Sequence, residues 1–267
     1  MPDRAPPVPP VPSVPPASLP LTVVIPTLNE AWQIAEALAS LRWADEVIVA
    51  DGGSTDDTVA IARAHGARVI EVKGPTIAAQ RNAAIAAARN QWILALDADE
   101  RVTAALREEL GVVLAAPAHA AYRIRMQNIY LGRERRRGRW GRDWHVRLFQ
   151  RPRRFVETRV HEHLERVPDT GELSGCIRHA PYRDLTHHLE KIILYARWGA
   201  QDLHARGRRA TAWDLTARPL WRFARDYVVA GSWLDGRGGI VASVLTAYSG
   251  FLKYAYLWDL GARSPTA

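Results

Sequence analysis

The sequence predicts an α/β protein in which a mixed sheet is flanked by helices and followed by a helical appendage. Three observations predict it. Up to about residue 100, short apolar segments rich in β-branched residues alternate with helix-like segments, as in a parallel sheet covered on both faces. Residues 120–131 and 145–151 then alternate apolar and polar side chains, as half-exposed strands do. From Asp184 onward, apolar residues recur at helical spacing.

The first four strands are expected where short apolar runs end in polar or small residues. Segments of helical pattern separate them, of which residues 32–41 are the clearest example, with apolar side chains on one face. This alternation favours βαβ units with parallel strands. The expected strands are 21–26, 46–51, 68–72 and 92–99.

Composition divides the chain into three parts. Residues 1–20 hold nine prolines and no continuous apolar stretch, so we expect a disordered, partly polyproline-like tail and not a secretory signal. Residues 21–183 form the expected α/β domain, and residues 184–267 form a helical region packed on it. A chain of 267 residues has room for one large domain with such an appendage.

The charge balance indicates anionic partners. The net charge is +8, and only three of the 36 basic residues are lysines. Part of the arginine excess can reflect a GC-rich coding sequence. The remainder favours substrate phosphates, an acidic membrane surface or nucleic acid, although no nucleic-acid-binding motif accompanies it.

The overall composition is that of a globular protein, with 48% hydrophobic and 24% charged residues. Cys176 is the single cysteine, which excludes an internal disulfide and suits a reducing compartment. We therefore expect a cytoplasmic protein.

Polar clusters of small residues follow three of the expected strands. They are Thr27–Glu30, Asp51–Ser54 and Asp97–Glu100. Ligands of open α/β sheets bind outside the carboxyl ends of the strands, so these clusters are expected to line one crevice. Asp97 and Asp99 offer hard oxygen ligands to Mn²⁺ or Mg²⁺. The alternative is that both aspartates cap the following helix, but the apolar run before them favours the ligand site.

Four motifs in this order resemble the nucleotide-binding half of glycosyltransferase family 2. They are VVIPTLNE, VIVADGGSTDDT, GPTIAAQRN and WILALDADE. Two later segments, NIYLGRERRRGRWGRDWHVRLFQR and VHEHL, resemble the bacterial branch that contains lipopolysaccharide core β-1,4-glucosyltransferases. The resemblance covers roughly residues 21–258.

This resemblance implies a GT-A fold and an inverting transfer of a sugar, glucose in this branch, from a nucleotide-diphosphate donor that is often UDP-linked. The implied cofactor is Mn²⁺ or Mg²⁺, and the implied acceptor is an anionic envelope glycan such as the lipopolysaccharide inner core. Polyprenyl phosphate and peptides are alternative acceptors, and a basic nucleic-acid-binding protein is the non-enzymatic alternative. By motif, Asp97 would contact the ribose or the metal, and Asp99 the metal directly. The implied donor-binding residues are Thr27, Asn29, Glu30, Asp51, Gly52, Arg81 and Asp97.

The general base and the acceptor side are expected in the second half of the domain. An inverting transfer needs a group that takes the proton of the acceptor hydroxyl. Glu162, which follows a strand among polar residues, is the first candidate, and Asp143 is the second. The six arginines between residues 133 and 142 form either a solvated turn or a clamp for phosphorylated acceptors. The predicted acceptor-side residues are Arg135, Arg136, Arg137, Trp140, Arg147 and His161.

The apolar stretch 239–258 has three interpretations. It approaches the length of a membrane-spanning helix. Polar residues such as Ser243, Ser249 and Lys253 interrupt it, however, and its aromatic residues cluster near one end, as in interfacial helices. Packing against the core and peripheral contact with the cytoplasmic face of the inner membrane are therefore both favoured over a span.

Overall fold

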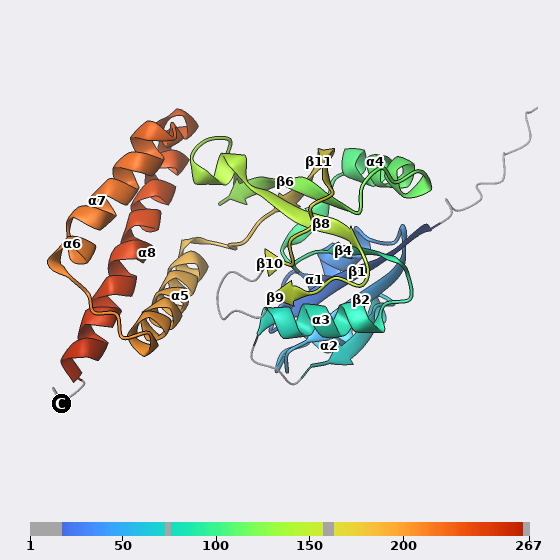
Figure 1. Ribbon diagram of the computed structural model, residues 1–267, viewed down its shortest axis with the longest axis horizontal. Coiled ribbons are helices and arrows are strands. Elements are labelled where there is room, and N and C mark those ends of the chain that lie inside the picture. Colours follow the sequence, from blue (N-terminus) through green and yellow to red (C-terminus); the bar gives the residue numbers. More distant parts are fainter. Residues whose placement is uncertain (1–17, 73–75, 157–162, 264–267) are drawn as a thin grey trace, which may run out of the picture.

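The structure has two parts, an α/β core and a group of helices at the carboxyl end, joined by one extended segment (Figure 1). It is a computed structural model that describes residues 18–72, 76–156 and 163–263. Most of the predicted proline-rich tail, residues 1–17, lies outside these described residues.

The central sheet is mixed. Its strands are β1 (Leu19–Thr27), β2 (Ala44–Asp51), β3 (Arg68–Glu71), β4 (Trp92–Ala95), β5 (Glu100–Val102), β6 (Ala121–Tyr130), β7 (Arg133–Glu134), β8 (Trp144–Gln150) and β11 (Thr170–His179). They lie in the order β3-β2-β1-β4-β8-β6-β11-β5, with β7 paired to β6. The first four strands are parallel, as their alternation with helices requires. Beyond them, β8 and β5 run antiparallel to their neighbours.

Helices cover both faces of this sheet. They are α1 (Ile34–Ala39), α2 (Thr58–Ala64), α3 (Ile77–Ala87) and α4 (Ala104–Ala115). Successive residues of a strand point to opposite faces, so Val23 belongs to one buried cluster and Val24 to the other. The first cluster contains residues of α1, α2 and α4, and the second contains residues of α3.

The carboxyl-terminal helices form the second part. They are α5 (Leu185–Ala205), α6 (Ala212–Leu215), α7 (Ala217–Ala224), the short turns η2 (Arg225–Val229) and η3 (Ser232–Asp235), and α8 (Gly236–Arg263). α8 runs beside both α5 and α7 (Figure 1). Asp184 caps α5, because its side chain accepts a hydrogen bond from the backbone N–H of His187.

An aromatic cluster joins the two parts. Tyr182, in the segment between β11 and α5, stacks on the His188 ring with centroids 3.9 Å apart. The hydroxyl oxygen of Tyr130, on β6, lies 3.0 Å from His188 Nδ1, and the Tyr130 ring contacts the Trp140 ring. The residues come from β6, from the short turn η1 (Arg139–Arg142), from the connecting segment and from α5.

The structure confirms the predicted mixed sheet with flanking helices and a helical appendage, and it differs in the bounds and number of the strands. β4 ends at Ala95, four residues before the expected end at residue 99, and the short strands β5 and β7 were not predicted. β1 begins at Leu19, two residues before the expected start at Leu21. β11 was not predicted from the sequence, because its buried positions alternate glycine with apolar residues, starting at Gly171 and Leu173. A Cβ on Gly175 would lie 2.5 Å from the Cα of Leu106, so close packing of α4 on the strand removes the apolar signal.

Candidate active site

The loops after β1 and β2 interlock at the carboxyl edge of the sheet. The Asp51 carboxylate accepts hydrogen bonds from the backbone N–H groups of Gly53 and Ser54, at 2.9 and 2.8 Å, and from the Thr27 hydroxyl. Asn29 has a φ of 57° and accepts a hydrogen bond from Thr55 N–H through its side chain. Asn tolerates this left-handed conformation better than most residues. Both predicted donor clusters are therefore brought together and held in place.

Gly52 and Glu30 complete this surface. A Cβ on Gly52 would collide with the side-chain amide of Gln80 on α3, so the Gln80 side chain would have to move to admit any larger residue there. Glu30 accepts a 2.6 Å hydrogen bond from Gln33, and burial raises the pKa of its carboxyl group. The positive charge of Lys191 on α5 opposes this rise, so α5 contributes charge to the site.

Asp97 is held between two arginines. One of its oxygens accepts a hydrogen bond from Arg81 on α3, and the other lies 3.1 Å from Arg147 Nη2 on β8. Burial would raise the pKa of Asp97, but the two guanidinium groups hold it well below its usual range. Arg147 also donates to Glu100, whose side chain is 1% exposed.

Asp99 faces a row of polar residues on neighbouring strands. The strand pairing places Glu100 of β5 beside His179 of β11, and His179 beside Asn128 of β6. His179 Nε2 lies 3.5 Å from Asp99 Oδ2, and its Nδ1 lies 2.7 Å from Asn128 Oδ1. An amide oxygen only accepts, so Nδ1 carries the proton. Nε2 then faces Asp99, with its own proton while the ring is charged and as a candidate metal ligand once that proton is lost.

The row continues to Asp143, the second predicted base. Asn128 donates to Asp143 Oδ2 at 3.3 Å, and His145 Nε2 lies 2.9 Å from Asp143 Oδ1. Burial acts to raise the pKa of Asp143, but these contacts outweigh it and lower the pKa. Asp143 is thus a carboxylate whose two oxygens are both engaged.

The residues around Asp99 fit a divalent metal. Its Oδ1 atom is buried and has no hydrogen-bond partner among the described residues, which is costly for a carboxylate oxygen unless a ligand meets it. Ligand atoms of Asp99, Glu100 and His179 lie within 4.8 Å of one another. Burial lowers the pKa of His179 and the Asp99 charge raises it, to about 9 overall. A cation is therefore favoured at this position, and in the apoprotein a proton on Nε2 supplies it.

The alternative in which the aspartates cap a helix is wrong. α4 is capped by Thr103, whose hydroxyl accepts a hydrogen bond from Leu106 N–H. Asp97 and Asp99 precede β5 and are turned toward the arginines and His179.

Two predicted acceptor-side residues have other environments. Arg147 lies with Asp97 and Glu100 in the donor half of the crevice, because β8 pairs directly with β4. Arg135 is 4% exposed, and its Nη1 lies 3.4 Å from Asp235 of η3. It joins the core to the helices and does not face an open surface.

The other predicted acceptor-side residues differ in their surroundings. Arg136 and Arg137 are exposed and line a pocket of about 520 Å³ with Arg125, Gln127, Glu134 and Gly141. Trp140 belongs to the aromatic cluster and accepts a hydrogen bond from Asn128 through its backbone oxygen. Glu162 and His161 lie outside the described residues.

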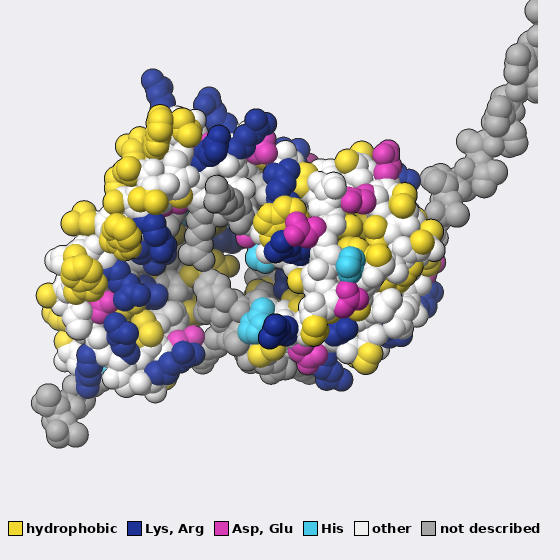
Figure 2. All heavy atoms as spheres, turned by 45° about the horizontal axis from the view of Figure 1, so that its top comes forward, with side chains coloured by type: hydrophobic (Ala, Val, Ile, Leu, Met, Phe, Trp, Pro, Cys, Tyr) yellow, Lys and Arg dark blue, Asp and Glu magenta, His cyan; other side chains and the backbone are white. Residues whose placement is uncertain are grey.

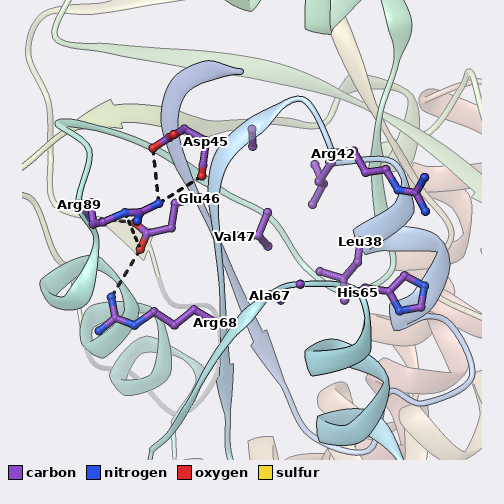
Figure 3. Close-up of a pocket in the computed structure, with 12 residues that line it drawn as sticks. Leu38, Arg42, Asp45, Glu46, Val47, His65, Ala67, Arg68 and Arg89 are labelled. Carbon is purple, nitrogen blue, oxygen red and sulfur yellow. Dashed lines mark hydrogen bonds and ion pairs between the residues drawn. The ribbon is translucent and has the colours of Figure 1, made fainter. Parts of the chain in front are cut away.

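A second pocket lies at the opposite edge of the sheet. It has a volume of about 440 Å³ and is lined by residues at the amino ends of β2 and β3. Arg68 and Arg89 pair there with Glu46, and Arg89 also pairs with Asp45 (Figure 3). Thr22 donates to Glu46 at 2.7 Å. The charged groups pair with one another and hold the strands together. This pocket is separate from the candidate site, because it lies at the other edge of the sheet.

The sequence did not predict His179 or Asn128 as site residues. Each is a single polar residue near the end of a strand. His179 is 79 residues and Asn128 is 28 residues from Glu100 in the chain. That His179 lies beside Glu100 is known only once β5 and β11 are paired. None of the motifs that carry the family resemblance contains His179, and Asn128 opens the segment NIYLGRERRRGRWGRDWHVRLFQR, which gave it no role of its own. Their role follows from the sheet alone.

Comparison with known proteins decides the family. Residues 22–176, more than half of the chain, match the family described as glycosyl transferase family 2. The chain belongs to glycosyl transferase family 2. The GT-A arrangement expected for the family agrees with the mixed sheet and its flanking helices, and the chain is a glycosyltransferase.

Relatives of this glycosyltransferase match nearly its whole length. An uncharacterized glycosyltransferase of Rickettsia prowazekii is 28% identical over 91% of this chain and 88% of its own. The lipopolysaccharide core biosynthesis glycosyltransferase LpsC of Rhizobium meliloti is 27% identical over 90% of this chain and 93% of its own.

Two solved structures are also similar. S. aureus TarS in complex with UDP-GlcNAc is 14% identical, covers 91% of both chains and has a TM-score of 0.49. Glucosyl-3-phosphoglycerate synthase from Mycobacterium tuberculosis, in complex with Mn²⁺, UDP and glucosyl-3-phosphoglycerate, is 25% identical. It covers 41% of this chain and 44% of its own, with a TM-score of 0.34.

Proposed function

We propose that this glycosyltransferase transfers a hexose, glucose in the first instance, from a UDP-linked donor to an anionic glycan of the bacterial envelope, with inversion at the anomeric carbon. One observation carries the proposal. The buried Oδ1 of Asp99, beside His179, has no hydrogen-bond partner within the part of the chain that the structure describes, and it lies at the edge of the sheet where the Thr27–Glu30 and Asp51–Ser54 loops meet. The lipopolysaccharide inner core is the proposed acceptor because LpsC, a relative along nearly the whole chain, is named for core biosynthesis.

Asp99 and His179 would hold Mn²⁺ or Mg²⁺, and the bound metal would neutralise the charge of the donor diphosphate. Mn²⁺ suits a mixed oxygen and imidazole site better than Mg²⁺, which prefers oxygen ligands. Asp97 is already bound by Arg81 and Arg147, so its proposed role is to orient these arginines and to accept a hydrogen bond from the ribose. Arg81 then faces the donor from α3.

The exposed arginines beside η1 provide the proposed acceptor side. Arg125, Arg136 and Arg137 line the 520 Å³ pocket, and Glu134, which pairs with Arg136, is the single acidic side chain among its described lining residues. Guanidinium groups bind phosphate in a bidentate manner, so this pocket suits a phosphorylated inner-core sugar. Polyprenyl phosphate carries the same group, and the acceptor panel below separates the two.

Glu162 remains the proposed general base. Asp143 is less suited, because its hydrogen bonds with Asn128 and His145 lower its pKa and occupy both oxygens. A base that takes a hydroxyl proton works best with a pKa near the working pH. The described residues next to Glu162 belong to the small hairpin of β9 (Phe155–Val156) and β10 (His163–Leu164). Asn82, adjacent to Arg81, holds Phe155 through two hydrogen bonds.

The test is a UDP-release assay with a panel of UDP-sugars and with inner-core oligosaccharide, polyprenyl phosphate or peptide as acceptor. We expect activity with Mn²⁺ and its loss with a chelator. Asp99→Asn and His179→Ala should each lower the rate by about 100-fold or more. Asp45→Asn, at the opposite edge of the sheet, is the matched control and should keep the wild-type rate. Activity that ignores the metal and survives Asp99→Asn would overturn the mechanism.

A further inference from the structure

The turn between α7 and α8 carries four large apolar side chains that face outward. Val228 and Val229 of η2 are 60% and 73% exposed, and Trp233 and Leu234 of η3 are each 54% exposed. Gly231, with a φ of 75°, makes the reversal between η2 and η3. We call Val228, Val229, Trp233 and Leu234 the apolar corner. So much exposed apolar surface on one turn marks an interaction site.

The exposed charges around the apolar corner are positive. Residues 206–258 contain eight basic side chains and only three acidic ones. The acidic side chains contribute little exposed charge, because Asp214 and Asp226 are 1% and 7% exposed and Asp235 is paired with Arg135. Arg225 and Arg237, which flank the corner in the chain, are both exposed. Apolar side chains bordered by arginines match the chemistry of an anionic lipid surface.

The apolar surface continues along one side of α8. Ile240, Val244, Tyr248 and Phe251 are exposed at intervals of three or four residues, the spacing of a single helix face. Another side of α8 is buried, at residues that include Gly239, Ala242, Gly250 and Tyr254, and α8 contacts α5 and α7. Figure 2 shows hydrophobic side chains along the outer edge of the helical part with Lys and Arg side chains beside them.

Length and composition alone would also permit a membrane span. Ser232–Arg263 is the one stretch among the described residues that is long and apolar enough for it. α8 packs along α5 and α7, and among the described helices neither of these is long and apolar enough to enter a bilayer with it, so a span would separate α8 from its packing partners. A helix with one packed face and one exposed apolar face suits a position in the plane of the interface.

The arginines of the proposed acceptor pocket are anchored to the same corner. The backbone N–H of Gly138 donates to the Ala230 oxygen at 3.0 Å, and that of Arg137 donates to Asp235 at 3.2 Å. The segment carrying Arg136 and Arg137 is thus fastened to η2 and η3. A surface bound at the corner would lie next to the pocket that these arginines line.

We propose that the apolar corner, with Arg225 and Arg237, inserts into the headgroup region of an anionic bilayer and holds the acceptor pocket at the membrane surface. The placement of the acceptor pocket rests on the proposed function, whereas the docking itself does not. A bilayer fits better than a protein partner because the exposed charges of residues 206–258 have one sign and flank protruding apolar side chains, as the headgroup boundary requires.

The test is flotation of the full-length protein with vesicles of phosphatidylcholine alone or with phosphatidylglycerol added. We expect binding to the anionic vesicles that weakens with salt. Val229→Asp/Leu234→Asp and Arg225→Glu/Arg237→Glu should each reduce binding by roughly tenfold or more. Val112→Asp is the matched control, since Val112 on α4 is also 73% exposed, and it should bind like wild type.

Several outcomes would overturn the proposal. They are equal binding to neutral vesicles, unchanged binding by both corner variants, or no binding by folded wild-type protein. A dimer in light scattering that the corner variants abolish, without vesicle binding, would assign the corner to a second copy of the chain. UDP release with a soluble acceptor should be unchanged in the corner variants. Absence of UDP release by the wild-type protein would refute the proposed function, and the result on vesicle binding would be unaffected.

Discussion

At the scale of single residues, Arg147 has two partners in the crevice. It lies between Asp97 and Glu100, and its own side chain is only 9% exposed. Burial would lower the pKa of Arg147, but the carboxylates outweigh it and raise the pKa. A buried charge is tolerable only while its partner is present, because the lost hydration has no other compensation.

We therefore predict that Arg147→Met lowers the free energy of unfolding by about 3–5 kcal/mol, because it leaves Glu100 buried without its arginine. Arg147→Met/Glu100→Gln should recover part of this loss. The measurement is urea denaturation followed by circular dichroism. Arg123→Met is the control, since Arg123 and Glu172 form a pair that is about half exposed and should contribute less than about 1 kcal/mol. Equal losses for both single variants would contradict the prediction.

At the scale of elements, the segment of six arginines is attached more firmly than its composition indicates. Its charge density predicts a solvated or mobile loop, yet η1 and the residues before it are tied to η2 and η3. Gly138 is the closest point of approach: its φ is 70°, and a Cβ there would collide with Ser232 Oγ and lie 2.8 Å from Asp226 Oδ1.

We predict that Gly138→Ala loosens this attachment. The left-handed backbone alone costs an alanine about 1–2 kcal/mol, and the collision adds to that cost. Gly207→Ala provides the control, because Gly207 has a φ of 73° and would meet nothing within 4 Å. Gly138→Ala should therefore destabilise the protein more than Gly207→Ala and also speed proteolysis within residues 133–142. Equal stabilities of the two variants would contradict the prediction, because they would show that the collision of an added methyl group with Ser232 has no cost.

At the scale of the whole molecule, His188 links the core to the helices. It is 5% exposed, and it is stacked on Tyr182 and hydrogen-bonded to Tyr130. Burial, together with the positive charges of His187 and Lys191, lowers the pKa of His188 from 6.5 to about 4. The folded protein therefore holds this ring neutral where the unfolded chain would protonate it.

The sign of the resulting pH dependence follows from proton binding. Below pH 6.5 the unfolded chain binds a proton that the folded protein refuses, so stability falls from pH 6.5 to about 4. The loss is at most about 3 kcal/mol. His188→Gln should remove this part of the pH dependence. The measurement is the free energy of unfolding at pH 7, 5.5 and 4.5 for both proteins, and parallel curves would contradict the assignment to His188.

The donor half of the fold could be predicted from local sequence patterns. Apolar runs that end in Thr27, Asp51 and Asp97 mark three neighbouring strands, and parallel strands bring their carboxyl ends to one edge whatever the rest of the chain does. The crevice and a candidate metal ligand in it, Asp99, could therefore be proposed from local patterns. The helical appendage was equally visible, because amphipathic periodicity is a local property.

The residues that complete the site and the surfaces that stay exposed follow from the three-dimensional packing of the chain. His179 meets Asp99 because β11 pairs with β5, and Arg147 joins the donor half because β8 pairs with β4. Both contacts join residues far apart in the chain, so no local pattern encodes them. The apolar corner is likewise exposed only because none of the described residues packs over it. Burial depends on every neighbour of a residue, whereas periodicity reports only its position on its own helix or strand.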